Sequence, residues 1–380
     1  MRYLAYVLLI TSLFSHDRLT ADVITVPADH PTIGEAINAA ESGDVILVGP
    51  GTWYENLFIV KSLVLQGAAD GTTIIDGSTA KFGGGSCATV ASVSVEIRSM
   101  VLRNGTGSEI FGRVRGGGIY IEFGSLHVVD VVIENCSVDL LPFKSEGWGG
   151  AICGYGSDIS IENCILRDNH SGTSGGAIWS GFGSLEIMHT VIASNVADMA
   201  GGAIFSRDTD VTISGSRVCG NTAGQTGGAI DHEMGTLLVD RTVLTGNTAV
   251  DGAALFVTEG SSVTNSEIIG SPLAEGSFLI HVSDAPEADP FSIGNTFFCG
   301  HEKWIFGGSG SYVETAPNEF NPVCPEPEDL NRDGLVGGAD LTLLLSAWGT
   351  EALLSGGDID CSGLIDGGDL ARLLAGWSSS

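Results

Sequence analysis

Apolar and polar residues alternate in short runs through the middle of the chain, and glycine-rich breaks separate the runs. Alternation with a period of two, rich in β-branched residues, predicts β-strands, and the glycines predict turns. The runs recur every 26 residues, with no helical pattern long enough for a crossover helix between them. A period of this length indicates stacked units that cannot bury their apolar faces alone. Each unit is therefore expected to be one coil of a parallel β-solenoid.

Several sets of residues keep this step. The tetrapeptide Gly-Gly-Ala-Ile occupies positions 149–152, 175–178, 201–204 and 227–230. The apolar sets are Ile159, Leu185, Val211, Leu237 and Val263, and Leu166, Ile192, Val218 and Leu244. The polar set is Asn169, Asn195, Asn221 and Asn247. Equivalent residues of successive coils lie about 4.8 Å apart, so stacked amides can hydrogen-bond to one another. Asn104 and Asn135 are expected to extend the asparagine set.

The pattern is less regular toward both ends of the repeat. The preceding Gly-Gly-Gly-Ile lies 33 residues before the next copy, which predicts a surface loop around 137–148. The motif weakens at 252–255, and the periodicity is lost from about residue 271. Terminal coils are expected to depart from the consensus because they must cap an open sheet. At the N-terminal end, residues 31–41 place Ile33, Ala36, Ile37 and Ala40 on one stripe, which predicts a capping helix.

The beginning of the solenoid resembles a known group of proteins. The segments Thr-Val-Pro-Ala-Asp-His-Pro-Thr-Ile (25–33), Gly-Asp-Val-Ile-Leu-Val (43–48) and Pro-Gly-Thr-Trp-Tyr-Glu-Asn (50–56) are similar to the opening of right-handed parallel β-helix proteins. This pectin-lyase-like group includes pectinesterases. The Gly-Gly-Ala-Ile and asparagine repeats are similar to the polymorphic outer membrane protein repeat. The resemblance covers residues 22–325 and implies an all-β domain, a right-handed parallel β-helix over 22–321. A fold of this kind does not by itself specify an activity.

A second repeat of a different kind follows a proline-rich linker at 322–328. Two twelve-residue segments, 329–340 and 358–369, begin 29 residues apart. Each has oxygen-bearing side chains at positions 1, 3, 5 and 12 and glycine at position 6, the pattern of a calcium loop. The candidate ligands of the first loop are Asp329, Asn331, Asp333, the carbonyl of Leu335, and Asp340. Those of the second loop are Asp358, Asp360, Ser362, the carbonyl of Leu364, Asp366 and Asp369.

Each loop leads into a Leu-rich segment that ends in tryptophan, at 341–348 and 370–377. Two such loop-helix units with a shared Leu/Trp core resemble a dockerin, a small α module with EF-hand-type loops that binds cohesins. The resemblance implies two Ca2+ ions and a small α domain over 329–380. Positions 10 and 11, which carry Ser or Thr contacts to the cohesin in many dockerins, are Gly338-Ala339 and Gly367-Gly368 here. The expected partner is therefore a cohesin-like protein or another surface anchoring protein.

Residues 1–21 are typical of a secretory signal peptide, because a run of about 12 apolar residues is too short to span a bilayer. No later segment is apolar enough for a membrane helix, so we expect a secreted or cell-surface protein. The net charge of −30 argues against nucleic acid and anionic membranes as partners and favours cations. Of the eight cysteines, Cys299 and Cys324 flank a non-repeating segment and are the favoured disulfide pair. Cys153 has no cysteine at equivalent positions.

Catalytic signatures of pectinesterases or polygalacturonases are not found in the sequence. One local cluster could act: Arg207 and Glu233 lie one period apart, with Asp208 and Asp231 beside them. Two close carboxylates could support acid–base cleavage of a glycosidic bond, and Trp179 could stack on a sugar ring. The alternative is a solvated turn of an acidic protein, with His232 a surface histidine.

Two functions remain open. In the first, a secreted β-helix without catalytic activity binds extracellular polysaccharide or another protein and is anchored by its calcium module. In the second, a polysaccharide-active hydrolase, lyase or esterase uses carboxylates on the β-helix surface. We favour the first because the family's catalytic signatures are missing.

Overall fold

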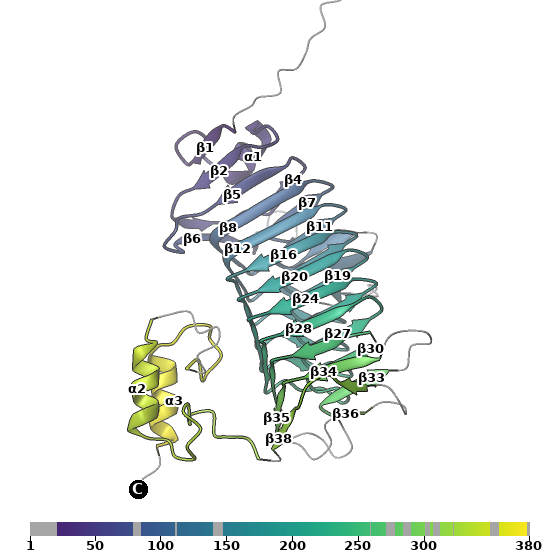
Figure 1. The fold of residues 1–380 in the computed structure, drawn as a ribbon. Helices are drawn as coiled ribbons and strands as arrows, with labels where there is room; N and C mark the ends of the chain where they lie inside the picture. Colours follow the sequence, from purple (N-terminus) through teal and green to yellow (C-terminus); the bar gives the residue numbers. More distant parts are fainter. Residues whose placement is uncertain are drawn as a thin grey trace, which may run out of the picture.

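The computed structural model describes residues 21–78, 85–110, 112–139, 147–258, 260–270, 278–283, 290–300, 305–306, 312–321, 323–349 and 357–377. In these ranges the chain winds into a long parallel β-solenoid, followed by a small unit with two helices (Figure 1). The expected signal peptide lies outside the described residues apart from its last position. Most of the expected loop at 137–148, residues 140–146, lies outside them as well.

The strands form four sheets, lettered A to D here. Sheet A contains β1 (Val23–Val26), β2 (Val45–Val48), β3 (Gly51–Trp53), β5 (Leu63–Gln66), β6 (Thr73–Asp76), β8 (Ser94–Arg103), β12 (Ser125–Glu134), β16 (Asp158–Glu162), β17 (Ile165–Arg167), β20 (Ser184–Met188), β21 (Val191–Ala193), β24 (Asp210–Ser214), β25 (Arg217–Cys219), β28 (Leu237–Asp240), β29 (Val243–Thr245), β31 (Ser262–Thr264), β32 (Glu267–Ile269), β34 (Phe291–Gly294), β35 (Phe297–Cys299), β37 (Tyr312–Glu314) and β38 (Glu319–Asn321). Sheet B contains β4 (Leu57–Ile59), β7 (Ala88–Ala91), β11 (Ile119–Glu122), β15 (Ile152–Tyr155), β19 (Ile178–Gly181), β23 (Ile204–Arg207), β27 (Ile230–Glu233), β30 (Leu255–Thr258), β33 (Ile280–Ser283) and β36 (Ile305–Phe306). Sheet C contains β9 (Ser108–Ile110), β10 (Arg113–Arg115) and β14 (Gly147–Trp148), and sheet D contains β13 (Ser137–Val138), β18 (His170–Ser171), β22 (Val196–Ala197) and β26 (Thr222–Ala223).

The core follows the expected register over the regular coils. Ile152, Ile178, Ile204 and Ile230 are direct neighbours in sheet B, and all four are fully buried. The set from Leu166 to Leu244 is aligned in the same way in sheet A. Each fully buried side chain of this size stabilises the fold by about 1.5–3 kcal/mol. The prediction for Val263 was wrong: it pairs with Val239, not Leu237, because this coil is two residues shorter than the 26-residue repeat.

The asparagine ladder runs through the inside of one bend. The side chain of Asn169 donates to Asn195 at 2.9 Å, Asn195 donates to Asn221, and Asn221 donates to Asn247 at the same distance. Neither Asn104 nor Asn135 extends the ladder, contrary to expectation, and Asn104 instead donates to Asp76 at 2.8 Å. The equivalent residue in the coil of Asn135 is Cys136, whose backbone N–H donates to the amide oxygen of Asn169.

The two glycines of each Gly-Gly-Ala-Ile motif serve different purposes. The first adopts a left-handed backbone, with φ +70° at Gly175, which glycine tolerates best. The second lies against the next coil: a Cβ atom on Gly176 would come within 2.1 Å of the carbonyl oxygen of Gly202. The motif therefore marks a point where successive turns lie in close contact.

At the N-terminal end, α1 (Ile33–Ala39) begins after Thr32 and buries Ile33, Ala36 and Ile37. The Thr32 hydroxyl accepts a hydrogen bond from the N–H of Glu35 at 3.2 Å. The carboxylate of Glu55 accepts from the N–H groups of Ile33 and Gly34, where a helix favours negative charge. Figure 1 places α1 beside β1 and β2 at the N-terminal end of the solenoid.

The C-terminal end of the solenoid extends further than its repeat pattern indicates. Strands β33 to β38 add coils beyond residue 271, with a disulfide between Cys299 and Cys324. The small unit contains α2 (Gly338–Ser346) and α3 (Gly367–Ala375), which begin three residues earlier than expected. Its core contains Val336, Leu344, Ile359, Ile365 and Leu373. The expected tryptophans are not part of that core, because Trp348 and Trp377 are about 40% exposed.

Candidate functional site

The first acidic loop folds around the side chain of its first residue. The two carboxylate oxygens of Asp329 accept hydrogen bonds from the N–H groups of Asp333 and Gly334 at 3.1 and 2.8 Å. At the other end, Asp340 accepts from the N–H groups of Asn331 and Gly337. Asp329 and Asp340 are both buried. Asp340, the last residue of the loop, lies in the first turn of α2 and is hydrogen-bonded to the beginning of the loop at Asn331.

The second loop repeats this arrangement. Asp358 accepts from the N–H groups of Ser362 and Gly363, and Asp369 accepts from those of Asp360 and Asp366. Carboxylate oxygens of Asp358, Asp360 and Asp369 all lie within 4.8 Å of one another. Asp366 caps α3 by accepting from the N–H of Gly368 at 2.7 Å. Three carboxylates are therefore brought together in one loop, as the sequence pattern predicts for ligands of a single cation.

The chemistry of these donors fits a hard divalent cation. Like charges this close repel one another, and burial raises the pKa of Asp358 to about 6, although the nearby Arg217 opposes that shift. Calcium takes six to eight oxygen ligands at about 2.3–2.6 Å and would neutralise the repulsion. In the described residues, carboxylates of Asp358, Asp360 and Asp369 are the oxygens that lie close enough together to share one ion.

The structure places the four residues of the expected catalytic cluster on and beside sheet B. Arg207 and Glu233 are register partners on β23 and β27 and form an ion pair of 3.5 Å. Asp208 occupies the left-handed turn after β23, with φ +49°, and its N–H donates to the carbonyl of Glu233. Both ion-pair partners are about half exposed. This pair lies on the surface, and only Asp231 is held in a buried setting.

Asp231 is 2% exposed and lies in register with Phe205, on the outward side of sheet B. Its Oδ2 atom accepts from the Thr226 hydroxyl, and Oδ1 has no hydrogen-bond partner among the described residues. Burial raises the pKa of this carboxyl to about 7, and the charge of Glu233 adds to the shift. Such a group can hold or release a proton near neutral pH.

His232 was expected at the surface and is instead fully buried, because alternation along β27 turns it into the solenoid. Its Nδ1 atom lies 2.8 Å from the hydroxyl of Ser206 in the adjacent coil. Loss of solvation lowers its pKa. The residue is therefore part of the interior and does not reach the outward face that holds Asp231.

Trp179 belongs to an aromatic cluster that sequence reasoning identified only in part. Its ring stacks on Trp148 with centroids 4.5 Å apart and lies parallel to Tyr155 at 6.3 Å. Tyr155 in turn contacts Phe123 at 5.7 Å and Phe182 at 5.3 Å. Phe123 and Phe182 are 58% and 52% exposed. We call Phe123, Tyr155 and Phe182 the aromatic surface. In the sequence, Phe123 and Phe182 occupy the same turn position in two of three coils, and this signal could have revealed the surface.

Two arginines approach this cluster. The guanidinium carbon of Arg115 lies 4.9 Å from the Trp148 centroid and 5.4 Å from that of Tyr155. The guanidinium carbon of Arg113 lies 5.3 Å from the same tryptophan ring. Arg115 is buried, donates to the Tyr120 hydroxyl at 3.2 Å, and has no partner for Nε among the described residues. Positive charge is therefore concentrated at one aromatic site of a strongly acidic chain.

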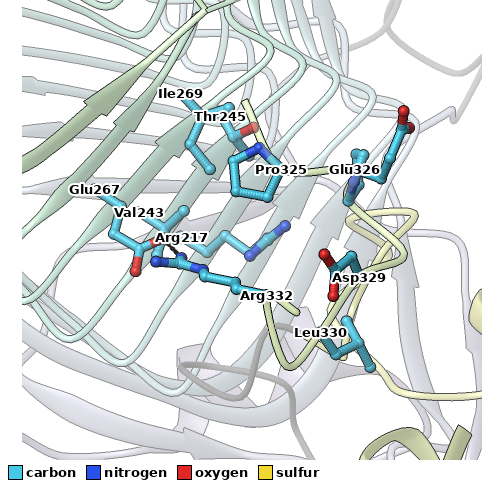
Figure 2. A pocket seen from close by; sticks show the side chains of 11 residues that line it. Arg217, Val243, Thr245, Glu267, Ile269, Pro325, Glu326, Asp329, Leu330 and Arg332 are labelled. Carbon is cyan, nitrogen blue, oxygen red and sulfur yellow. Dashed lines mark hydrogen bonds and ion pairs between the residues drawn. The ribbon is translucent and has the colours of Figure 1, made fainter. Parts of the chain in front are cut away.

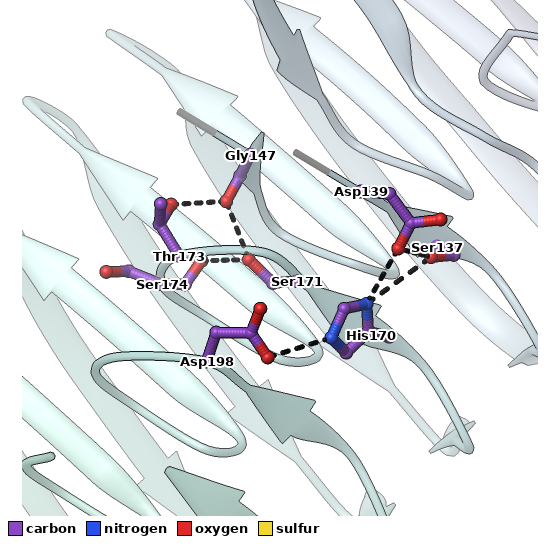
Figure 3. Close-up of polar contacts among 8 residues, drawn as sticks. All are labelled: Ser137, Asp139, Gly147, His170, Ser171, Thr173, Ser174 and Asp198. Atoms are coloured by element: carbon purple, nitrogen blue, oxygen red, sulfur yellow. Dashed lines mark hydrogen bonds and ion pairs between the residues drawn. The ribbon is translucent and has the colours of Figure 1, made fainter. Parts of the chain in front are cut away.

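A second group of polar residues lies at sheet D (Figure 3). His170 bridges two carboxylates of the neighbouring coils, with Nδ1 3.0 Å from Asp139 and Nε2 3.1 Å from Asp198. The hydroxyl of Ser137 donates to Asp139 at 2.8 Å, and its distance to His170 is 3.4 Å. Because that hydroxyl proton is directed to a carboxylate, the geometry does not activate Ser137 as a nucleophile. Through His170, side chains of three successive coils are connected to one another.

Comparisons with known proteins give likeness of structure only. No family model matches the chain, and no curated protein matches it. A pectin methylesterase in complex with a hexasaccharide is 14% identical, with 79% of this chain and 90% of that chain covered and a TM-score of 0.32. The surface adhesin PfbA of Streptococcus pneumoniae is 12% identical, with coverages of 80% and 92% and a TM-score of 0.42. The mannuronan C-5 epimerase AlgE6 A-module of Azotobacter vinelandii is 13% identical, with coverages of 76% and 88% and a TM-score of 0.34.

In the described part of the chain, no helix combines the length and the apolar character that a bilayer span requires.

Proposed function

We propose that this protein is a secreted calcium-binding β-helix protein that binds extracellular polysaccharide on its solenoid and is anchored through its C-terminal module. The observation that carries the proposal is the convergence of Asp358, Asp360 and Asp369, whose oxygens lie within 4.8 Å in a loop with a second, matching copy. A bound cation would offset the charge of these closely spaced carboxylates, two of which are buried.

Each loop would hold one Ca2+ ion. In the first loop the ligands would be Asp329, Asn331, Asp333, Asp340 and the carbonyl of Leu335. In the second they would be Asp358, Asp360, Ser362, Asp366, Asp369 and the carbonyl of Leu364. The protein's own contribution is to fix the first and last carboxylates through backbone N–H donors, so that few dihedral angles remain to be ordered when the ion binds.

Calcium titration of the metal-free full-length protein tests this proposal. We expect two sites by isothermal calorimetry, one lost in Asp340→Ala and one lost in Asp369→Ala. Glu186→Gln, a change of an exposed carboxylate on the solenoid, serves as the matched control and should leave both sites. Titration without heat or with unchanged stoichiometry in both variants would contradict calcium binding at these loops.

Anchoring would use exposed apolar side chains of the calcium-loaded module. Leu343 and Leu345 on α2, together with Trp348 and Trp377, are 39–51% exposed. A cohesin-like protein or another surface anchoring protein is the proposed partner. Binding of a purified cohesin, measured with calcium and again with a chelator, should be calcium-dependent. Absence of binding in both conditions would exclude cohesins and leave other anchoring proteins to be tested.

The aromatic surface is the proposed polysaccharide site. Exposed rings can stack on the apolar faces of sugar rings, and Phe123, Tyr155 and Phe182 extend over three successive coils. Arg113 and Arg115 at the adjoining Trp148 would favour a glycan that carries negative charge. This surface combines exposed aromatic area with positive charge.

Affinity electrophoresis through gels that contain neutral or acidic polysaccharides tests the solenoid's role. Phe123→Ala/Phe182→Ala should abolish the retardation that the unchanged protein shows. Met234→Ala is the matched control, because Met234 occupies the same left-handed turn position and is 46% exposed. Equal retardation of all three proteins would contradict binding at the aromatic surface.

An alternative function is catalysis on polysaccharide as a hydrolase, lyase or esterase. The observation that favours it is the pKa of Asp231, raised by burial to about 7, with Glu233 two residues away and paired to Arg207. Asp231 would act as the acid and Glu233 as the base. Release of reducing or unsaturated ends from pectins and other acidic glycans would support it. Turnover that persists in Asp231→Ala/Glu233→Ala would remove these residues from the mechanism.

A further inference from the structure

The second acidic loop is covalently joined to the side of the solenoid. Cys361, between the candidate ligands Asp360 and Ser362, forms a disulfide with Cys219 on β25, 142 residues earlier. Cys219 belongs to a small apolar cluster with Val191 and Ala193, and Cys361 packs against that cluster. Sequence reasoning missed this pair.

Close packing accompanies the covalent bond. A Cβ atom on Gly363 would lie 2.7 Å from the Cδ1 atom of Ile165 on β17, so this glycine lets the loop approach sheet A. Arg217, on the same strand as Cys219, directs its Nε atom to the sulfur of Cys361 at 3.4 Å. The second loop thus contacts the solenoid through Cys361 and Gly363, in the middle of the loop.

The first loop has a different connection to the solenoid. Arg332, within that loop, forms an ion pair of 2.6 Å with Glu267 on β32, and its guanidinium carbon lies 5.1 Å from the ring centroid of Phe297. Figure 2 shows this pair beside Arg217, at a cavity of about 280 Å3 between the solenoid and the residues around Asp329. Arg332 is 46% exposed, so solvent weakens this contact. The disulfide is the stronger of the two attachments.

We propose that the C-terminal module is docked on sheet A of its own chain and that the Cys219–Cys361 disulfide couples this docking to cation binding at the second loop. The proposal rests on the calcium function proposed above. A loop with a fixed central residue loses less conformational freedom when its ligands close on an ion. The oxidised protein therefore binds the ion more tightly at this loop. Coupling is reciprocal, so a bound ion also protects the disulfide from reduction.

Charge at the interface acts against this effect and has to be weighed. The positive charge of Arg217 lies near Asp358 and disfavours a cation at the second loop. Glu267 lies close enough to the same guanidinium to offset that charge. These charges come together only when the module is docked, and because Asp358 is buried, salt screens them less than it screens surface charges. The constraint on the loop does not depend on salt. A coupling of about tenfold in the dissociation constant is within the usual range for linked sites, and it should persist at high ionic strength.

The first experiment asks whether the bond forms. The oxidised full-length protein is digested without reductant, and the peptides are analysed by mass spectrometry. We expect a linked pair of peptides that contain Cys219 and Cys361, and this pair should disappear with dithiothreitol. In that reaction the S–S bond breaks, two thiols form, and the reductant supplies two electrons and two protons as it becomes a cyclic disulfide. Free thiols at both positions in the oxidised protein would overturn the proposal.

The second experiment measures the coupling. Cys219→Ser changes the solenoid and leaves the loop sequence intact, while Cys299→Ser/Cys324→Ser removes the other disulfide as a matched control. Calcium calorimetry should show one of two sites weakened about tenfold in Cys219→Ser, with both sites unchanged in the control. Reduction of the unchanged protein by dithiothreitol should reproduce the effect, which separates it from misfolding. Unchanged affinities in both would overturn the coupling.

Failure of the calcium proposal remains distinguishable from failure of the docking. A protein that binds no calcium but yields the linked peptides would refute the calcium function and the coupling while retaining the docked module. Cleavage of the linker between Cys324 and Asp329 by a protease gives an independent measure of docking, because the Cys299–Cys324 disulfide then stays within the N-terminal fragment. We expect the N- and C-terminal fragments to remain together without reductant and to separate with it. Separation without reductant would overturn docking through Cys219 and Cys361.

Discussion

Gly176 and its equivalents set how closely two coils can approach. Backbone atoms around Gly176 leave no room for a side chain. Gly246 has a left-handed backbone with open space around it, because the nearest atom to an added Cβ would be 3.8 Å away. Ser194 occupies the position equivalent to Gly246 in another coil with φ +56°, so a side chain is tolerated there. Two glycines of one repeat thus face different constraints.

Gly176→Ala and Gly246→Ala should separate these constraints. We expect Gly176→Ala to lower the free energy of unfolding by roughly 3 kcal/mol or more, because backbone atoms of two coils must move. Gly246→Ala should cost about 1 kcal/mol, the strain of a left-handed alanine. Denaturant unfolding followed by far-UV circular dichroism measures both. Equal costs would show that coil spacing does not depend on the second glycine.

Asp231 predicts a dependence of stability on pH. Its pKa of about 7 in the folded protein lies above its ordinary value of 3.8. The unfolded chain therefore loses this proton first as pH rises. Below about pH 4, the neutral carboxyl makes its full contribution to the free energy of unfolding. This contribution falls as the pH rises from about 4 to about 7, and the total loss is on the order of 4 kcal/mol.

Asp231→Asn removes this titration while keeping an oxygen for the Thr226 hydroxyl. Its melting temperature should match that of the unchanged protein at pH 4 and exceed it by roughly 5 °C or more at pH 8. Asp208→Asn is the control, because an asparagine also accepts the left-handed backbone of that turn. If the difference for Asp231→Asn is the same at both pH values, the carboxyl is not held neutral in the fold.

For the strands and the asparagine ladder, the sequence correctly predicted the alignments between coils of equal length. Ile178 and its equivalents align as expected because each coil between them has the same length. Val263 does not, since a shortened coil shifts the register and sequence spacing alone cannot tell which strand loses residues. Asn135 was misplaced by one residue for a related reason: it precedes Cys136, which holds the ladder position.

Asn195 lies in the interior of that ladder and should be costly to remove. Its oxygen accepts from both the backbone N–H and the side chain of Asn169, and its own side chain donates to Leu166 and Asn221. Asn195→Ala leaves buried donors and acceptors without partners, at about 1–3 kcal/mol each. Thr222→Ala, an exposed change whose hydroxyl meets Thr248, should cost less than about 0.5 kcal/mol. Similar unfolding midpoints for the two variants would contradict a stabilising ladder.

For the molecule as a whole, the two parts of the chain were predictable separately but their contact was not. The loop ligands could be identified because calcium chemistry fixes a spacing along the sequence. The disulfide between Cys219 and Cys361 joins residues from two different repeats, and nothing in either repeat indicates the other. The aromatic surface was missed for a similar reason, since Phe123 and Phe182 come together only when the coils are stacked.

The two parts should also respond differently to loss of calcium. Without a cation, the buried carboxylates of the two loops keep only backbone N–H donors and the nearby Arg217 to offset their charge, whereas the solenoid core is apolar. Free calcium at a hundred times the dissociation constant stabilises each site by about 2.7 kcal/mol. We therefore expect a chelator to lower only the melting transition of α2 and α3 and to leave the β signal in place.

Thermal unfolding of the full-length protein by far-UV circular dichroism, with calcium and then with a chelator, resolves this. A helical transition that moves to lower temperature and a β transition that stays would support separate folding units. Asp340→Ala/Asp369→Ala should show the chelated behaviour even with calcium present, which ties the shift to the loops and not to other effects of the chelator. A single transition that carries both signals and moves as one would instead mean that the docked module and the solenoid unfold together, so that calcium at the loops stabilises the entire chain.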